Sequence, residues 1–255
     1  VLQALEEKRK YYRLKEGTLL SLETKEFEEI RRFIHTVPEQ IDELEKGLEV
    51  PVIQGLRLLD VTNESSTIHI DDTFQSFLNS ISNPDINDFP VPKQLQGVLR
   101  NYQIKGFRWL KSLARFGFGG ILADDMGLGK TLQSITFIVS ELHSIRKGNP
   151  VLIVCPASVT YNWFNELNKF APEIQTKVVD GQKSDRYHRF KDMEEVDVLI
   201  TSYPLLRSDI DWYKKQKFHT IFFDEAQSFK NPLTQTARTV KKLKANHLLF
   251  SQSYI

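Results

Sequence analysis

The sequence predicts an α/β fold in which a parallel sheet is covered by helices on both faces and is preceded by a smaller α+β domain. After residue 92, short apolar runs alternate with helical patterns, which is typical of such a sheet. Just before, Asn83–Pro92 (NPDINDFPVP) contains three prolines and marks a boundary. Residues 1–90 hold 10 Lys and Arg against 18 Asp and Glu, whereas residues 91–255 hold 24 against 15. We therefore expect an accessory domain over residues 1–90 and an α/β domain over residues 91–255.

The first expected element of the amino-terminal region is a β-hairpin. Lys10–Leu22 alternates apolar and polar residues around a central Glu-Gly pair. Glu23–Thr36 has apolar residues at helical spacing, and a proline two residues later ends the pattern, so we expect a helix there. The segment IHIDDTFQSFLNSI predicts a short strand and then a helix that begins at Asp71 or Asp72 and ends at Ile81.

The expected elements of the α/β domain follow from the spacing of apolar residues, which repeats about every 3.6 residues in a helix and every second residue in a half-buried strand. Purely apolar runs such as VLIV indicate buried strands. We expect helices over Asn101–Phe116, Thr131–Arg146, Val159–Phe170 and Thr234–Leu243, and strands over Gly120–Ala123, Val151–Val154, Lys177–Val179, Val196–Thr201, Thr220–Phe223 and His247–Phe250. Ligands of open parallel sheets bind at the carboxyl ends of the strands. A site is therefore expected at the strand ends Ala123, Val154, Thr201 and Phe223.

The composition argues against a disulfide-bonded, a zinc-binding and a membrane-spanning protein. Cys155 is the single cysteine, which excludes an intrachain disulfide and a cysteine-based zinc site, and the six histidines show no metal-ligand spacing. No run approaches the roughly 18 apolar residues of a membrane helix, and no leader pattern begins the chain. We expect a soluble, cytoplasmic protein, associated with the nucleoid if it is bacterial. Because the first residue is Val1 rather than methionine, we expect a piece of a longer chain.

The stretch ILADDMGLGKT gives the strongest functional signal. Glycines after an apolar run let backbone amides turn toward a phosphate at the start of a helix. Lys130 would reach the outer phosphates, and Thr131 would place a hydroxyl on Mg²⁺. Asp124 stands where the general G-x-x-x-x-G-K-[ST] pattern has its first glycine, so the pattern is not met in full, and a glycine-rich turn without a ligand is the alternative. We expect the phosphates of a bound nucleotide to contact the loop formed by Met126, Gly127, Leu128, Gly129, Lys130 and Thr131.

The stretch TIFFDEAQ supplies an acidic pair after another apolar run. Asp224 would hold Mg²⁺ directly or through water, and Glu225 would orient and activate the attacking water. Alone, such a pair more often begins a helix or a surface turn. Asp224 follows Lys130 by 94 residues, and we expect its strand to neighbour the strand of the glycine loop. Together the two signals favour a single nucleotide site.

Five motifs then occur in a fixed order, namely LRNYQIKGFRWL from Leu99, ILADDMGLGKT from Ile121, VLIVCPASVTYNWFNELNKF from Val151, VLITSYPLLRSDI from Val198 and DEAQSFKNP from Asp224. In this order and spacing the chain resembles the Swi/Snf-type DNA translocase ATPases, relatives of the superfamily-two helicases. The resemblance covers residues 93 to about 250, with Asp125 where glutamate is common. It implies a RecA-like P-loop NTPase lobe. For the complete protein it implies DNA-stimulated ATP hydrolysis, translocation on double-stranded DNA, and remodelling or displacement of a DNA-bound protein. Residues 1–90 more weakly resemble the accessory region of bacterial members.

The resemblance also implies contact residues. Gln103 would contact the adenine, with Arg100 nearby, and a solvated helix residue is the alternative for Gln103. Two turns after strand ends would touch the nucleic-acid backbone through Pro156, Ser158, Asn162, Thr201, Ser202 and Tyr203. Short donors such as those of Ser158 and Asn162 also suit phosphate oxygens on physical grounds.

Aromatic and basic runs nearby have plainer interpretations. Trp163 shares helical spacing with other apolar residues, which favours packing against the sheet over base stacking. The basic runs 214–217 (KKQK) and 241–244 (KKLK) fit a solvated face at least as well as phosphate contacts.

Family motors have a second lobe whose arginine stabilises the charge of the transferred phosphoryl group. This chain contains one lobe, so we expect it to bind ATP and Mg²⁺ and expect hydrolysis in the complete protein. Ser251–Ile255 does not match the Leu-Thr-Gly-Thr-Pro motif that the family shows at this point. Two other functions stay open: a strand-separating DNA or RNA helicase, and a nucleotide-gated scaffold without turnover.

Overall fold

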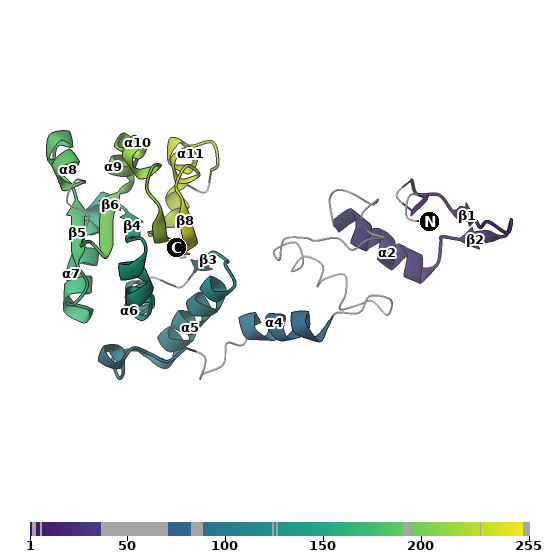
Figure 1. Cartoon of the computed structure of the whole chain (residues 1–255), viewed down its shortest axis with the longest axis horizontal. Helices are drawn as coiled ribbons and strands as arrows, with labels where there is room; N and C mark the ends of the chain where they lie inside the picture. The colour runs from purple at the N-terminus through teal and green to yellow at the C-terminus, as the bar shows by residue number, and fades with distance from the viewer. Residues whose placement is uncertain are drawn as a thin grey trace. The chain divides into compact units, whose positions relative to one another are not determined.

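The computed structural model describes residues 1, 4–5, 7–36, 71–82, 89–123, 125, 127–190, 195–229 and 231–251. The chain divides into two compact units, Val1–Leu78 and Asn79–Ile255 (Figure 1). Within the described ranges, no helix combines the length and the apolar character that crossing a membrane requires.

The first unit contains the predicted hairpin and helix. Strands β1 (Tyr11–Arg13) and β2 (Leu19–Ser21) pair antiparallel. Helix α2 (Lys25–Thr36) follows them. The three elements share one small core, formed by buried Ala4, Leu5 and Leu22 with Tyr12, Leu20, Phe27 and Ile30 packed against them.

Helix α4 (Asp72–Ser82) begins where the sequence predicts. Its start is capped by Asp71, whose carboxylate accepts a hydrogen bond from the backbone N–H of Thr73 at 3.3 Å. The strand predicted just before it, the proline at position 38 after α2 and the boundary proline at position 84 lie outside the described residues.

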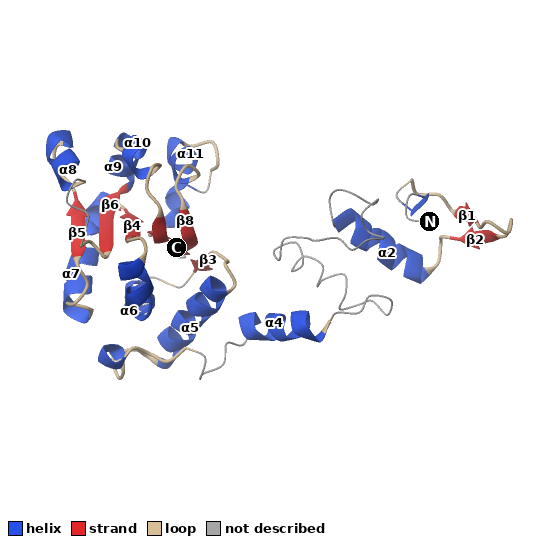
Figure 2. Cartoon of the chain, viewed as in Figure 1, coloured by secondary structure: helices blue, strands red, loops and turns tan. Residues whose placement is uncertain are grey.

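The second unit is built on a six-stranded sheet in the order β3-β8-β7-β4-β6-β5, and every neighbouring pair is parallel (Figures 1 and 2). Its strands are β3 (Gly120–Leu122), β4 (Val151–Cys155), β5 (Thr176–Val179), β6 (Val198–Ser202), β7 (Phe218–Phe223) and β8 (Ala245–Ser251). All residues of the central strands β4, β6 and β7 are buried, because helices cover both faces. The predicted α/β class is therefore confirmed.

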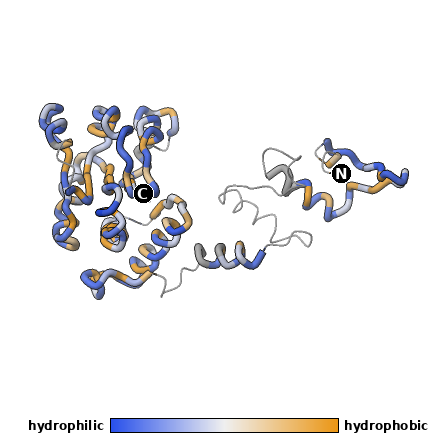
Figure 3. The backbone as a smooth tube through the Cα atoms, in the orientation of Figure 1, coloured by the Kyte–Doolittle hydropathy of each residue, from blue (hydrophilic) through white to orange (hydrophobic). Residues whose placement is uncertain are grey.

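The helices of this unit alternate with the strands. They are α5 (Asn101–Arg115), α6 (Lys130–Lys147), α7 (Thr160–Phe170), α8 (Lys183–Arg189), α9 (Tyr203–Ser208), α10 (Ile210–Tyr213) and α11 (Gln235–Val240). Hydrophilic and hydrophobic segments alternate along the helices that cover the sheet (Figure 3), as expected where one side of a helix faces a core and the other faces water.

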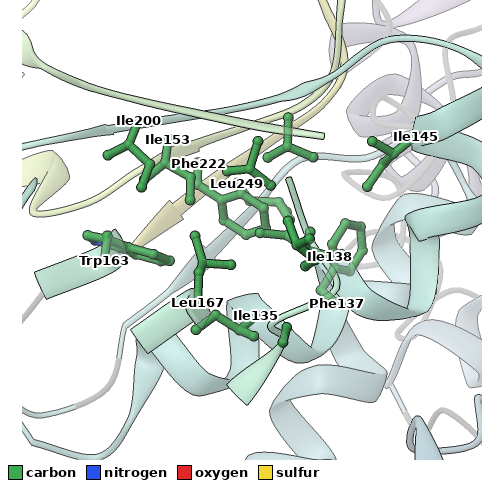
Figure 4. Close-up of a cluster of buried hydrophobic side chains, with 14 of the residues drawn as sticks. Ile135, Phe137, Ile138, Ile145, Ile153, Trp163, Leu167, Ile200, Phe222 and Leu249 are labelled. Atoms are coloured by element: carbon green, nitrogen blue, oxygen red, sulfur yellow. The ribbon is translucent and has the colours of Figure 1, made fainter. Parts of the chain in front are cut away.

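Two cores lie on opposite faces of the sheet. Along β4, Ile153 and Cys155 join the core under α5, α6 and α7, whereas Leu152 and Val154 join the core under α9 and α10. Figure 4 shows the first core, in which Trp163 and Leu167 of α7 lie on the same side of the sheet as side chains from α6. The alternation follows from the strand period of two.

One topological expectation is wrong. We expected the strand of the glycine loop and the strand of the acidic pair to be neighbours, but β8 lies between β3 and β7. Sequence order does not reveal this insertion, because β8 is the last described strand and reaches its place by a crossover.

Candidate functional site

The carboxyl ends of the neighbouring strands β3, β8 and β7 lie side by side at one end of the sheet. Register pairs Leu122 of β3 with Ser251 of β8, and Phe223 of β7 with Phe250 of β8. Asp224, the first residue after β7, is therefore level with Ser251. Since neighbouring strands lie about 4.8 Å apart, the ends of β3 and β7 are about 10 Å apart. That spacing suits one ligand that touches both ends.

The glycine loop joins β3 to α6. Gly127 and Gly129 have φ angles of 83° and 74°, in the left-handed region that favours glycine, and Gly129 is the residue before the first helical turn. At Gly129 an added Cβ would also overlap Nε2 of Gln103. The loop therefore needs glycine at this position for its backbone shape and for its contact with α5. Asp124 and Met126 lie outside the described residues.

Lys130 and Thr131 are the first two residues of α6. The first amides of a helix have no partner within it, so its start attracts anions. The Lys130 ammonium donates to the backbone carbonyl of Asp125 at 2.9 Å, which holds the side chain back over the loop. Thr131 is partly exposed beside it.

Side chains of helix α5 form hydrogen bonds to the glycine loop. Gln103 is 6% exposed, and its Oε1 accepts from the backbone N–H of Arg100 at 2.8 Å while its Nε2 donates to the Leu128 carbonyl at 3.1 Å. The Tyr102 hydroxyl donates to the same carbonyl at 3.0 Å. Gln103 is thus not the solvated helix residue that was the alternative interpretation. Arg100 is exposed at the start of α5.

Three donors hold the Asp224 carboxylate. Oδ1 accepts from the Ser251 hydroxyl at 2.6 Å and from the backbone N–H of Glu225 at 3.1 Å. Oδ2 accepts from the indole N–H of Trp163 at 2.8 Å. The backbone N–H of Asp224 donates to the carbonyl of Val154 at 2.8 Å, which ties the acidic pair to β4.

Glu225 has a φ angle of 52°, which is uncommon for a residue with a side chain and costs on the order of 1 kcal/mol. Its carboxylate accepts a hydrogen bond from the side-chain amide of Gln227. Strained backbone of this kind is concentrated at functional sites, because surrounding structure must hold it in place. Here the holding groups are the fixed Asp224 on one side and Gln227 on the other.

Burial changes the pKa values of titratable groups near the acidic pair. Burial raises the pKa of the Cys155 thiol to about 12, and burial likewise raises the pKa of Tyr203, with a smaller contribution from the charge of Asp224. The Tyr203 hydroxyl donates to the Asp224 carbonyl at 2.7 Å. Burial also raises the pKa of Glu166 on α7, which the negative charge of Asp224 raises further. The Asp224 carboxylate therefore accepts its hydrogen bonds from neutral donors, namely the Ser251 hydroxyl, the Trp163 indole and the Glu225 backbone N–H.

The residues predicted to face nucleic acid fall into two groups. Ser158 and Asn162, after β4, are exposed, and Pro156 is partly exposed. The side chains of Thr201, Ser202 and Tyr203, after β6, are buried, so the structure does not offer them to a polyanion. For these three the predicted contact is left to backbone atoms. In the basic runs 214–217 and 241–244 all the lysines are exposed, and Lys214 pairs with Asp211 at 2.6 Å.

The sequence patterns did not predict two side chains that contact the acidic pair. Trp163 was assigned to the core, and it is 2% exposed in that core, but a buried indole N–H needs an acceptor and here takes Asp224. Ser251 was set aside because the residues around it do not match a known motif. Its position at the end of a strand beside the acidic pair is the signal that could have found it.

The donor set fits Mg²⁺ bound together with a triphosphate. Magnesium prefers oxygen ligands and is usually held by one or two carboxylates with substrate phosphates. Asp224 and Thr131 offer such oxygens. Among the described residues, no group of three or more His, Cys, Asp or Glu is placed to hold a metal ion by itself. A site of this composition therefore depends on the phosphates of its ligand.

Comparison with known proteins gives two family matches that cover different parts of the chain. Residues 102–250 match the model of the SNF2-related domain, and residues 1–92 match the model described as bacterial SNF2 helicase associated.

Individual proteins that are similar to this chain come from the same family. An uncharacterized ATP-dependent helicase of Mycoplasma pneumoniae is 38% identical over 167 residues, which is 66% of this chain and 16% of the relative. The chromatin-remodeling ATPase INO80 of Emericella nidulans is 38% identical over 187 residues, 69% of this chain and 11% of the relative. The solved SWI2/SNF2 ATPase core of Sulfolobus solfataricus in complex with double-stranded DNA superposes with a TM-score of 0.59 at 37% identity, over 66% of this chain and 34% of that one. The chain thus spans a small part of these relatives.

Proposed function

The chain belongs to the SNF2-related family, and we propose that it contains the first ATP-binding lobe of a DNA-dependent ATPase that moves along double-stranded DNA and remodels or displaces a bound protein. The observation that carries this proposal is the edge of the sheet where the glycine loop before α6 and the fixed carboxylate of Asp224 lie on either side of β8. Loop amides and a carboxylate at that spacing suit a triphosphate and its metal ion.

In this proposal each residue has a separate role. The amides at the start of α6 and the Lys130 ammonium bind the phosphates. Asp224 and Thr131 hold Mg²⁺, which when bound supplies positive charge against the charge of the transferred phosphoryl group. Glu225 orients the attacking water and accepts its proton. Gln103, with Arg100 close by, contacts the base of the nucleotide.

Hydrolysis requires a further group in this proposal. Phosphoryl transfer in such motors needs an arginine that stabilises the charge of the transition state. The chain covers 34% of the solved core that it resembles, so we assign that arginine to a second lobe of the complete protein. The chain itself would bind ATP without efficient turnover.

The exposed turn after β4 is the proposed DNA-facing surface. Ser158 in that turn and Asn162 in the first turn of α7 present short polar groups on it, and residues 91–255 carry nine more positive than negative charges. Such contacts read the backbone of a duplex and not its base sequence. Residues 1–90 form the proposed accessory domain, with the boundary near residue 91. A DNA-bound protein of this kind belongs in the cytoplasm, at the nucleoid in a bacterium.

The test is ATP turnover by the complete protein with and without duplex DNA. Lys130→Ala and Asp224→Ala should each abolish turnover. Lys147→Ala is the matched control, since Lys147 is an exposed lysine at the other end of α6, and it should leave turnover unchanged. Near-normal turnover by Lys130→Ala would refute the motor. Absence of DNA stimulation in the unmodified protein would favour a scaffold, and efficient unwinding of forked duplexes would favour a strand-separating helicase.

A further inference from the structure

The Asp224 carboxylate is reached from two directions by side chains of the same lobe. Ser251 approaches from β8, within the sheet, whereas Trp163 approaches from α7, above it. Of the two, the contact from Ser251 goes to Oδ1, which also receives the N–H of Glu225. Trp163 supplies the hydrogen bond that the structure gives to Oδ2.

The hydrogen bond from Trp163 matters because a carboxylate can accept only a limited number of hydrogen bonds. An ionised carboxylate offers about four lone-pair positions, two on each oxygen. The described donors use both positions of Oδ1 and one of Oδ2. Among the described residues, the Trp163 indole N–H is thus the donor that orients Oδ2, whereas two donors share Oδ1.

Trp163 is buried in the core of the lobe. It is 2% exposed, and the neighbouring core residue Leu167 on the same helix is fully buried (Figure 4). It lies in the first turn of α7, which starts at Thr160 directly after the turn at residues 157–159, where Ala157 and Ser158 are exposed. The Thr160 hydroxyl bonds to the carbonyl of Ala157 at 3.2 Å, so that turn and the start of α7 are joined. The turn is thus tied by a hydrogen bond to the helix that carries the indole ring.

We propose that Trp163 is a positioning residue for Asp224, and that it links the exposed turn after β4 to the direction in which the metal-holding carboxylate points. This inference rests on the proposed function, because it gives the metal and the nucleic acid their proposed places. It adds that the two are coupled through one hydrogen bond from a residue otherwise buried in the core.

The first experiment removes the N–H donor and keeps an aromatic, though smaller, side chain at this position. In the complete protein, Trp163→Phe should lower kcat for DNA-stimulated ATP hydrolysis about tenfold or more, while KM for ATP stays within about twofold. Trp212→Phe is the matched control, because Trp212 is also in a helix of this lobe but stacks on Phe190 with ring centroids 3.9 Å apart. An equal loss of kcat in Trp212→Phe, or a kcat of Trp163→Phe within twofold of the unmodified protein, would overturn the proposal.

The second experiment needs no change in the tryptophan and no turnover. The 255-residue chain has three tryptophans, so its indole N–H groups give three resonances in a ¹H–¹⁵N spectrum. Asp224→Asn replaces a charged acceptor by a neutral one, and one indole resonance should then move upfield while the other two stay in place. If all three stay in place, the hydrogen bond does not exist in solution and the proposal falls. This result decides even if Trp163→Phe fails to fold.

The two proposals fail differently. If Lys130→Ala abolishes turnover but Trp163→Phe does not change it, the motor stands and the positioning role is lost. If Lys130→Ala turns over ATP normally, the motor itself is refuted, whatever Trp163 does.

Discussion

The hydroxyl of Ser251 donates a hydrogen bond to the Asp224 carboxylate across 2.6 Å and so joins the ends of β8 and β7. Ser251 is buried at the last described position of β8, where its backbone also pairs with Leu122 of β3. A single residue thus connects the strand of the glycine loop with the strand of the acidic pair. Four predictions follow from the contacts around this edge and from the core beneath it.

Removing this hydroxyl should weaken hydrolysis without weakening ATP binding. In the complete protein, Ser251→Ala should lower kcat about tenfold, because partners that orient a metal-holding carboxylate are typically worth ten- to a hundredfold. Ser251→Thr keeps the hydroxyl and should retain most of the activity. Steady-state ATPase assays and titration with a fluorescent ATP analogue measure the two quantities separately. Equal activity of the alanine and threonine variants would contradict the assigned contact.

Gly129→Ala should abolish ATP binding, since the position combines a left-handed φ of 74° with an overlap between the new Cβ and Gln103. Gly97→Ala is the control for backbone strain alone: its φ is 80°, and nothing lies within 4 Å of an added Cβ. Each change should cost about 1 kcal/mol of stability from the backbone, with a further loss at Gly129. Urea unfolding and nucleotide titration of the chain test this. Normal ATP binding by Gly129→Ala would show that the loop can shift.

The free energy of unfolding should fall in acid because Glu141 becomes protonated there. Its close contact with His219, at 3.6 Å, and its ion pair with Lys111 lower its pKa from 4.5 to about 2. A lowered pKa in the folded state stabilises the protein above pH 4.5, and this stability is lost as the pH falls from there toward 2. Full protonation would cost about 3 kcal/mol.

The measurement is the free energy of unfolding in urea at pH 6 and at pH 3. Glu141→Gln should show a smaller fall between these pH values than the unmodified chain. Asp211→Asn is the control, because Asp211 forms an ion pair with Lys214 on the surface, where such pairs contribute little. The same fall in Glu141→Gln as in the unmodified chain would remove the assigned role of Glu141.

Cys155 should be inert to thiol reagents while the chain is folded. It is fully buried, and burial raises its pKa to about 12, so almost no thiolate is present at pH 8. An aromatic disulfide reagent should therefore react only as fast as the lobe opens, and rapidly in denaturing urea. Stoichiometric reaction within seconds under native conditions would show that the end of β4 is accessible.

Sequence reasoning predicted the parallel sheet and most of its elements because their signals are local. The apolar runs of β4, β6 and β7 are fully buried, as continuous apolar strands should be. Helices α8, α9 and α10 have four to seven residues and were not predicted, since so short a segment shows too little of the helical period. Strand order was partly missed, because the insertion of β8 depends on a crossover that leaves no pattern in the sequence.

For the candidate site, the loop and the acidic pair could be located because glycine, lysine and carboxylate types at fixed spacing carry their chemistry in the sequence. Whether Lys130 and Asp224 bind one ATP stays a prediction. The contacts of Trp163 and Ser251 could not be located in the same way. An apolar helical face predicts that an indole is buried, but only the fold shows which acceptor its N–H meets.

The place of β8 between β3 and β7 has a consequence for how the lobe is made in the cell. β3 is translated early, yet its partner in the sheet is the last described strand, so no emerging segment before residue 245 can complete that edge. Until then the nascent lobe presents two unpaired strand edges, which are templates for wrong pairing with other chains. Ribosome-bound intermediates that stop short of residue 245 should therefore be the ones that chaperones must protect.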